Sequence, residues 1–160
     1  MSDLDTMPDY DALVIGAGVT GIYQVYLLDQ AGRSVLGVDT ADDVGGTWYW
    51  NRYPGCRLDT ESYAYGYFAL TGIVPDWKWS EHFAGQPEVL RYVNAAADAM
   101  DVRRHFRFRT RVSTAHFQDD SGLWKVTLND STVVTCRFLI SATGPLSATL
   151  MPDIAGIETF

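Results

Sequence analysis

The chain has 160 residues, of which 47% are hydrophobic and 13% aromatic, so it can bury one sizeable core and lacks the bias of a disordered sequence. Its 12 basic and 20 acidic residues give a net charge of -8, which disfavours nucleic acid and anionic membranes as partners. Residues 1–9 lack the features of a signal peptide, and no run approaches the ~20 apolar residues of a membrane span. We predict one cytoplasmic domain over residues 1–160, with its oligomeric state left open.

The residues that bind metals or form disulfides are sparse. Cys56 and Cys136 are far apart in the chain and lack CxxC spacing, which indicates two reduced thiols. His82, His105 and His116 have no partner at the spacing of a metal site. We therefore predict no bound metal.

The first forty residues follow the order strand, glycine turn, helix, strand. Residues 10–15 form an apolar run typical of a buried parallel strand, and a Gly-x-Gly-x-x-Gly turn over residues 16–21 follows it directly. An apolar helix is predicted over residues 22–31, and a second buried strand over residues 34–38 ends at Asp39. These elements make one βαβ unit.

Residues 41–76 lose this periodicity and are rich in glycine, proline and aromatic residues. A loop of this length is usually functional or disordered, and the aromatic content argues against disorder. Pro87 then begins a helix whose apolar residues share one face at 3.6-residue spacing, and we predict that this face is core without chemistry. Its members are Val89, Leu90, Val93, Ala96, Ala97 and Met100.

The last third of the chain has the period-two pattern of strands. Residues 106–112 alternate apolar side chains with three arginines, which we interpret as one strand with a solvated face and not as a binding patch. Turns at residues 119–122 and 129–131 separate strands at 123–128 and 132–136, which completes an antiparallel meander. A buried strand over residues 138–141 returns the chain to the first sheet. The predicted fold class is α/β, a Rossmann-like parallel sheet with a small β-meander.

The glycine turn is suited to a dinucleotide. Gly16 permits the tight turn, Gly18 lets a pyrophosphate approach the backbone, and Gly21 allows close packing of helix on sheet. The N-terminus of the helix offers free N–H groups to the phosphates. Asp39 would bind the adenosine ribose hydroxyls and repel a 2′-phosphate, so FAD or NAD is expected and not NADP. The alternative is a glycine-rich turn that binds nothing.

The layout after the βαβ unit favours FAD over NAD. A simple NAD domain would continue with alternating strands and helices, whereas this chain inserts an aromatic loop, a helix and a meander before residues 138–144. This order resembles flavoproteins with two dinucleotide-binding domains, in which an ATG motif follows the meander. Ala142, Thr143 and Gly144 match that motif. We therefore predict a partial FAD-binding domain of such a flavoprotein.

Residues 45–59 read GGTWYWNRYPGCRLD, which resembles the GG-T-W-Y-W-N-R-Y-P-G-x-x-x-D segment of Baeyer-Villiger monooxygenases. The resemblance runs from about Asp9 to Phe160. It implies an enzyme that uses FAD, NADPH and O2 to convert ketones to esters or lactones through a peroxide at flavin C4a. Without the flanking glycines, the aromatic residues at 48–50 would be interpreted as ordinary core.

The resemblance also implies roles for individual residues. Thr20 and Asp39 would contact the ADP half of FAD, with the backbone of Val112 near the adenine. Residues 46–50 would lie along the flavin and exclude water from it. Arg57, Leu58 and Asp59 would approach the nicotinamide nucleotide, although an exposed loop charge is an equal interpretation of Arg57. The complete set of predicted cofactor-binding residues is Gly16, Gly18, Thr20, Gly21, Asp39, Gly46, Thr47, Trp48, Tyr49, Trp50, Arg57, Leu58, Asp59, Tyr65, Val112 and Gly144.

Asp59 is also the catalytic candidate. The resemblance places Asp59 and Tyr65 near the isoalloxazine ring, where a carboxylate could orient a neighbouring arginine or tune its charge state.

Several parts of the resembled family are not found in this sequence. It has no second glycine turn for NADPH, and Phe160 would supply only the first residue of the family's F-x-G-x-x-x-H-x-x-x-W-P motif. The arginine that stabilises the peroxide would also lie beyond this residue. We therefore expect an inactive, aggregation-prone fragment. Two alternatives stay open, an N- or S-oxidising flavin monooxygenase and a non-catalytic module that binds FAD or docks onto another polypeptide.

Overall fold

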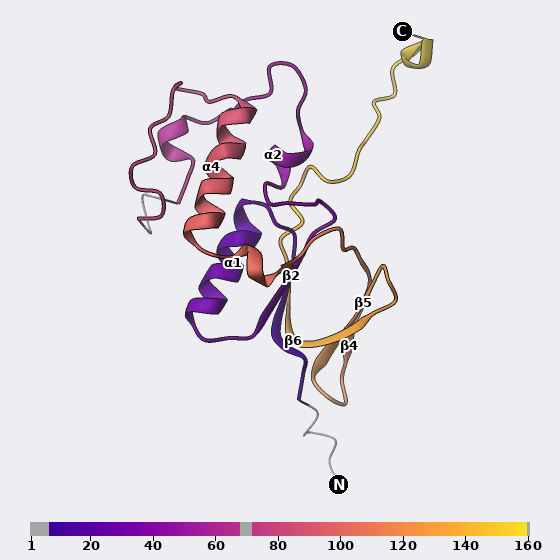
Figure 1. Ribbon diagram of the computed structural model, residues 1–160. Coiled ribbons are helices and arrows are strands. Elements are labelled where there is room, and N and C mark those ends of the chain that lie inside the picture. The colour runs from indigo at the N-terminus through magenta and orange to yellow at the C-terminus, as the bar shows by residue number, and fades with distance from the viewer. Residues whose placement is uncertain (1–6, 68–71, 160) are drawn as a thin grey trace.

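The computed structural model describes residues 7–67 and 72–159. A six-stranded sheet with the order β3-β2-β1-β6-β5-β4 forms its centre (Figure 1). The four strands from β3 to β6 are parallel, and β6, β5 and β4 are antiparallel. This confirms the predicted α/β class. The strands are β1 (Tyr10–Ile15), β2 (Val35–Val38), β3 (Phe106–Arg107), β4 (Val112–Gln118), β5 (Leu123–Leu128) and β6 (Val133–Ser141).

Two long helices lie on the same side of the parallel strands (Figure 1). Helix α1 (Val19–Gln30) begins three residues before the predicted position, and α4 (Gln86–Ala99) buries the predicted apolar face except for the partly exposed Leu90. Buried residues of both helices belong to one core cluster with Ala12 and Val14 of β1. The short helices are α2 (Thr47–Trp50), η1 (Ser62–Ala64), η2 (Arg103–His105) and η3 (Ile157–Thr159).

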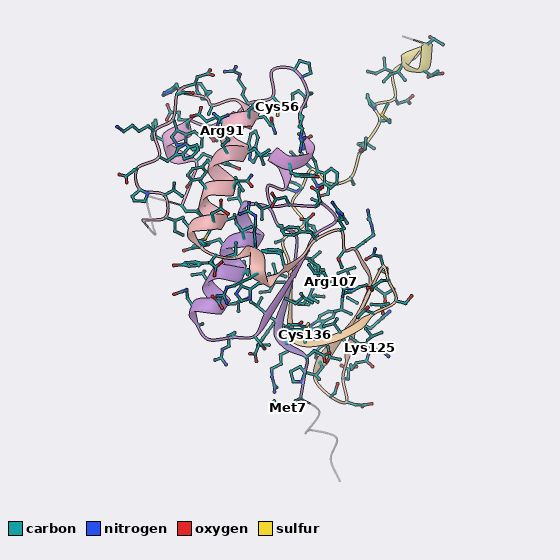
Figure 2. The ribbon with its side chains drawn as sticks, in the orientation of Figure 1. Met7, Cys56, Arg91, Arg107, Lys125 and Cys136 are labelled. Atoms are coloured by element: carbon teal, nitrogen blue, oxygen red, sulfur yellow. The ribbon has the colours of Figure 1, made fainter. Side chains whose placement is uncertain are left out.

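The meander forms a second core on the other face of the sheet. Because side chains alternate along a strand, Leu13 of β1 points away from Ala12 and Val14 and packs with Val126, Leu128 and Cys136. Burial raises the pKa of Cys136 to about 11. Figure 2 shows Cys56 and Cys136 in widely separated parts of the molecule, so they cannot form a disulfide with each other.

The predicted strands over residues 132–136 and 138–141 form one continuous strand. The first half of β6 pairs with β5 in antiparallel fashion, from Val133 to Cys136. Its second half pairs with β1 in parallel fashion, with Phe138 opposite Ala12. The prediction of two strands was wrong because one strand joins the meander to the parallel sheet without an intervening turn.

The predicted strand over residues 106–112 is broken. Arg109 has a φ of 54°, which ends the extended backbone. The amides of Arg109 and Thr110 instead donate to the carbonyls of Ala41 at 2.7 Å and Asp39 at 2.8 Å. The arginines are exposed as predicted, and Arg107 pairs with Asp130. Bonding to the loop after β2 therefore overrides the local strand pattern.

Apolar side chains lie exposed on one strand and on the last segment. Phe138 is 65% exposed although β6 has a strand on each side. The segment after β6 extends away from the body (Figure 1) and exposes Leu146, Leu150, Met151 and Ile154. Aggregation of the chain, which exposed apolar side chains favour, stays a prediction. No helix within the described ranges is long and apolar enough to cross a membrane.

Candidate dinucleotide-binding site

The glycine turn joins the end of β1 to the first turn of α1. A Cβ atom on Gly16 would lie 2.4 Å from the carbonyl oxygen of Ala142, and one on Gly21 would lie 1.8 Å from that of Gly16. On Gly18, by contrast, a Cβ atom would meet only Gly46 Cα at 3.5 Å, an ordinary contact. The outer two glycines are therefore required by packing within the chain, whereas Gly18 leaves open space beside the turn.

Helix α1 presents its N-terminus to this space. No side chain caps it, and its first turn contains no acidic residue. Its first N–H groups and the positive end of its dipole are thus available to an anion. Thr20 lies exposed in this first turn.

Asp39 is held directly beside the glycine turn. Its Oδ2 accepts a hydrogen bond from the N–H of Ala17 at 2.6 Å, and its Oδ1 accepts one from the N–H of Ala41 at 2.8 Å. The bond from Thr110 to the Asp39 carbonyl brings the nearby start of β4, at Val112, toward the same place. The structure therefore groups Asp39, the glycine turn and the Val112 region at the carboxyl ends of the parallel strands.

The aromatic segment begins in contact with the glycine turn. The N–H of Gly45 donates to the carbonyl of Ala17 at 2.9 Å. Gly46 has a φ of 53°, and a Cβ atom on it would lie 2.6 Å from Gly18 Cα. Only glycine permits this approach of two backbones. The two motifs, distant in sequence, therefore form one site, and α2 starts at its edge with Thr47.

The three aromatic residues of α2 have different surroundings. Trp48 is 7% exposed, and its Nε1 donates to the hydroxyl of Tyr65 at 2.8 Å. Tyr49 donates to Asp42, and this hydrogen bond raises the pKa of Tyr49 and lowers that of Asp42. Trp50 is 58% exposed. Trp48 is thus part of the core, which was the alternative interpretation of the aromatic residues at 48–50. Trp50 is exposed and free to contact a planar ligand.

Asp59 and Tyr65 lie near each other. Burial raises the pKa of Tyr65, and the negative charge of Asp59 contributes in the same direction. The Asp59 side chain itself is exposed. Tyr65 therefore lies near both Trp48 and Asp59, and the contact of these residues with a cofactor stays a prediction.

The loop before Asp59 is held by the segment that precedes α4. The N–H of Leu58, a buried residue, donates to the carbonyl of Ala84 at 2.9 Å. Arg57 pairs with Glu81 at 3.1 Å and donates to the carbonyl of Phe83 at 3.2 Å. Both charged side chains of this pair are about half exposed. Arg57 thus has the surroundings of a surface charge, and its binding role stays a prediction.

The end of β6 completes the edge of the site. The N–H of Ala142 donates to the carbonyl of Ile15 at 2.8 Å, which places the ATG motif beside the glycine turn. Gly144 has a φ of 71° and would meet nothing within 4 Å if it carried a Cβ atom, so the positive φ alone favours glycine there. Phe160, assigned to the F-x-G motif, lies outside the described residues.

Two residues that support the site were missed in the sequence. The hydroxyl of Tyr67 donates to the carbonyl of Val19 in the first turn of α1, and burial raises the pKa of this tyrosine. The side-chain amide of Gln86 donates to the carbonyl of Trp48 in α2. Both contacts join segments that are distant in sequence, for which periodicity and motif spacing carry no signal.

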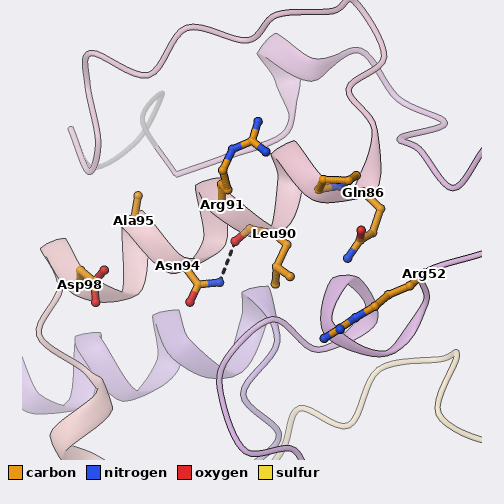
Figure 3. Close-up of a pocket in the computed structure, with 8 residues that line it drawn as sticks. Arg52, Gln86, Leu90, Arg91, Asn94, Ala95 and Asp98 are labelled. Atoms are coloured by element: carbon orange, nitrogen blue, oxygen red, sulfur yellow. Dashed lines mark hydrogen bonds between the residues drawn. The ribbon is translucent and has the colours of Figure 1, made fainter.

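A groove of about 570 Å³ lies along the outside of α4 (Figure 3). It is bordered by Arg52, Gln86, Leu90, Asn94 and Asp98 and does not include the glycine turn. The candidate dinucleotide site lies instead at the carboxyl ends of the parallel strands, where ligands bind in this class of sheet. We therefore place the site by its backbone geometry and assign the groove no ligand.

The chain is similar to known proteins over most of its length. Residues 14–72 match the model of an NAD(P)-binding Rossmann-like domain. A 2-oxo-Delta(3)-4,5,5-trimethylcyclopentenylacetyl-CoA monooxygenase from Pseudomonas putida is 69% identical over 100% of this chain and 29% of that protein. A Baeyer-Villiger monooxygenase from Pseudooceanicola batsensis is 45% identical over 95% of the chain and 28% of that protein. A phenazine N-monooxygenase from Lysobacter antibioticus is 38% identical over 94% of the chain and 28% of that protein.

A solved structure has the same fold. The crystal structure of OTEMO in complex with FAD and NADP matches with a TM-score of 0.91 and 70% identity, over 97% of this chain and 29% of that one. The chain spans less than a third of the length of each of these relatives. By sequence and fold, it is therefore similar to part of these flavin-dependent monooxygenases, a Baeyer-Villiger monooxygenase among them.

Proposed function

We propose that the chain binds the ADP half of FAD at the glycine turn and holds the flavin against α2. It would do so as part of a longer cytoplasmic enzyme that uses NADPH and O2 to convert ketones to esters or lactones. The observation that carries this proposal is the backbone contact between Gly18 and Gly46, which unites the turn and the aromatic segment.

The residues of the site fit this cofactor. The open space at Gly18 suits a pyrophosphate, whose charge the free N–H groups and dipole of α1 would stabilise. The Asp39 carboxylate already accepts two backbone amides and keeps lone pairs for the ribose hydroxyls. The bound FAD would supply the redox chemistry, and this chain would bind it, orient it and exclude water.

Aromatic residues provide the water exclusion. Trp48 is fixed by its hydrogen bond to Tyr65, so the neighbouring Trp50 projects from a rigid support. We infer that Trp50 covers part of the flavin, since it is exposed in this chain and adjoins the turn through α2. Arg57 and Leu58 would approach the nicotinamide nucleotide on the loop that leads to Asp59.

A titration with FAD tests the proposal. We expect saturable quenching of flavin fluorescence when the purified chain is added, because the ring would stack on an aromatic residue of α2. Asp39→Ala should lose this quenching, since it removes the acceptor for the ribose hydroxyls. Asp130→Ala is the matched control. Like Asp39, Asp130 accepts a hydrogen bond from a backbone N–H, but it lies at the β5–β6 turn, where it pairs with Arg107. Equal quenching by Asp39→Ala and the unaltered chain would contradict the assignment.

Asp59→Ala in the full-length protein should slow oxygenation more than it weakens FAD binding. The side chain is exposed beside Tyr65 and has no role in the core, so its loss removes a charge next to the flavin and little packing. We expect a fall in turnover of about tenfold or more with FAD affinity within about twofold. Turnover and FAD content measured on the same preparation check this, and unchanged turnover would rule out a catalytic role.

A second function is supported by one observation. The similarity extends at 38% identity to a phenazine N-monooxygenase, so N-oxidation is compatible with this portion of the chain. Product analysis of the full-length protein with a cyclic ketone and with phenazine, an aromatic N-heterocycle, would separate the two reactions. An ester or lactone supports the first function, and an N-oxide supports the second. FAD binding without either product would favour a non-catalytic module.

A further inference from the structure

Helix α2 depends on its surroundings for its position. A helix of one turn is not stable by itself in water. The carbonyl of Tyr49 accepts a bond from Arg52, a neighbour in sequence, at 2.8 Å. The carbonyl of Trp48 accepts its bond from the side chain of Gln86. Among the hydrogen bonds of the described ranges, this is the one that ties the backbone of α2 itself to a distant element.

Gln86 is itself rigidly placed. It is 7% exposed, and its own N–H donates to the carbonyl of Cys56 at 2.8 Å. As the first residue of α4, it is carried by a long helix that packs in the core. Figure 3 shows its side chain reaching from the start of α4 toward the loop that bears Arg52. One residue thus bonds both α2 and the strand-like segment that leads to Arg57.

We propose that Gln86 is a positioning residue that sets α2 relative to the loop over residues 57–59. The inference rests on the proposed function, in which α2 lies along the flavin and this loop approaches the nicotinamide nucleotide. Because the carbonyl of Trp48 lies at a buried contact with α4, loss of its donor would leave an unsatisfied acceptor and remove the hydrogen bond that sets α2 relative to the loop, while the Trp48–Tyr65 bond remains. Gln86 would therefore act on nucleotide binding without touching either nucleotide.

The test uses the full-length protein loaded with FAD and measures the dissociation constant for NADP+ through the change in flavin absorbance. Gln86→Leu keeps a similar volume and removes the donor, so this constant should rise about tenfold while FAD content is retained. Gln86→Glu adds a pH dependence. At about pH 8 the carboxylate cannot donate to the Trp48 carbonyl, whereas at about pH 5.5 a protonated carboxyl can, since burial raises its pKa. We expect a recovery of about fivefold on acidification, relative to the unaltered protein.

Gln118→Leu is the matched control, because Gln118 is exposed at the end of β4 and remote from α2. This variant should change neither the affinity for NADP+ nor the FAD content. If Gln86→Leu binds NADP+ within about twofold of the unaltered protein, the positioning role is refuted and the proposed function is untouched. If the unaltered protein binds no FAD, the proposed function itself fails. If Gln86→Leu does not fold, the test is the recovery of NADP+ affinity by Gln86→Glu on acidification. If that recovery is absent, the positioning role of Gln86 is refuted.

Discussion

Replacing Gly21 with alanine is expected to lower the free energy of unfolding by about 3 kcal/mol, a large part of the 5–15 kcal/mol of an average domain. The new Cβ atom would lie 1.8 Å from the carbonyl oxygen of Gly16 and 2.8 Å from its carbonyl carbon. Both are backbone atoms of the turn, so no side-chain rotation relieves the overlap. Helix α1 must move away from β1, and the core contacts of Ile22 and Val25 weaken with it.

Chemical denaturation of the purified chain, followed by circular dichroism, measures this effect. Gly85→Ala is the control, because Gly85 has an ordinary φ of -73° and its Cβ atom would meet nothing closer than 3.7 Å. We expect that variant to lose less than about 1 kcal/mol, the effect of alanine at a helix N-cap. Equal stability of the two variants would show that the packing of α1 on the turn is not tight.

The fold was predictable wherever local periodicity decides the element. The first strand has the predicted bounds, Tyr10–Ile15, because a short apolar run between a polar start and a glycine turn leaves few alternatives. The break at Arg109 was not predictable, since the bonds of residues 109 and 110 go to the loop after β2. The continuity of β6 likewise depends on its neighbours β1 and β5, which flanking residues do not specify.

The site was predictable in its parts but not in its assembly. The glycine turn and Asp39 follow from spacing, because a βαβ unit brings the ends of its two strands to one edge. The contact between Gly18 and Gly46 joins segments whose spacing along the chain carries no signal. Gln86 could not be recognised because a glutamine at a helix start is usually solvated, and its burial depends on where α2 packs.

Gly18→Ala should give the opposite result to Gly21→Ala, with the fold retained and FAD binding lost. Gly18 has a φ of -79° and an extended ψ of -175°, a conformation open to any residue. Its Cβ atom would contact only Gly46 Cα, at 3.5 Å. The free energy of unfolding should therefore change by less than about 1 kcal/mol.

The added methyl group would, however, occupy the space that we assign to the pyrophosphate. Each charge-assisted hydrogen bond lost to the phosphates is worth about 1.5–3 kcal/mol, so the dissociation constant for FAD should rise about a hundredfold. Flavin fluorescence on titration of the full-length protein measures it, with circular dichroism to establish that the variant is folded. A folded Gly18→Ala variant with unchanged FAD affinity would place the pyrophosphate away from the turn and remove the main support for the proposed function. Loss of FAD binding by a folded Gly18→Ala variant would show that Gly18 faces the ligand, whereas Gly21 is required for packing. The contacts that a Cβ atom would make at the two positions already differ in this way.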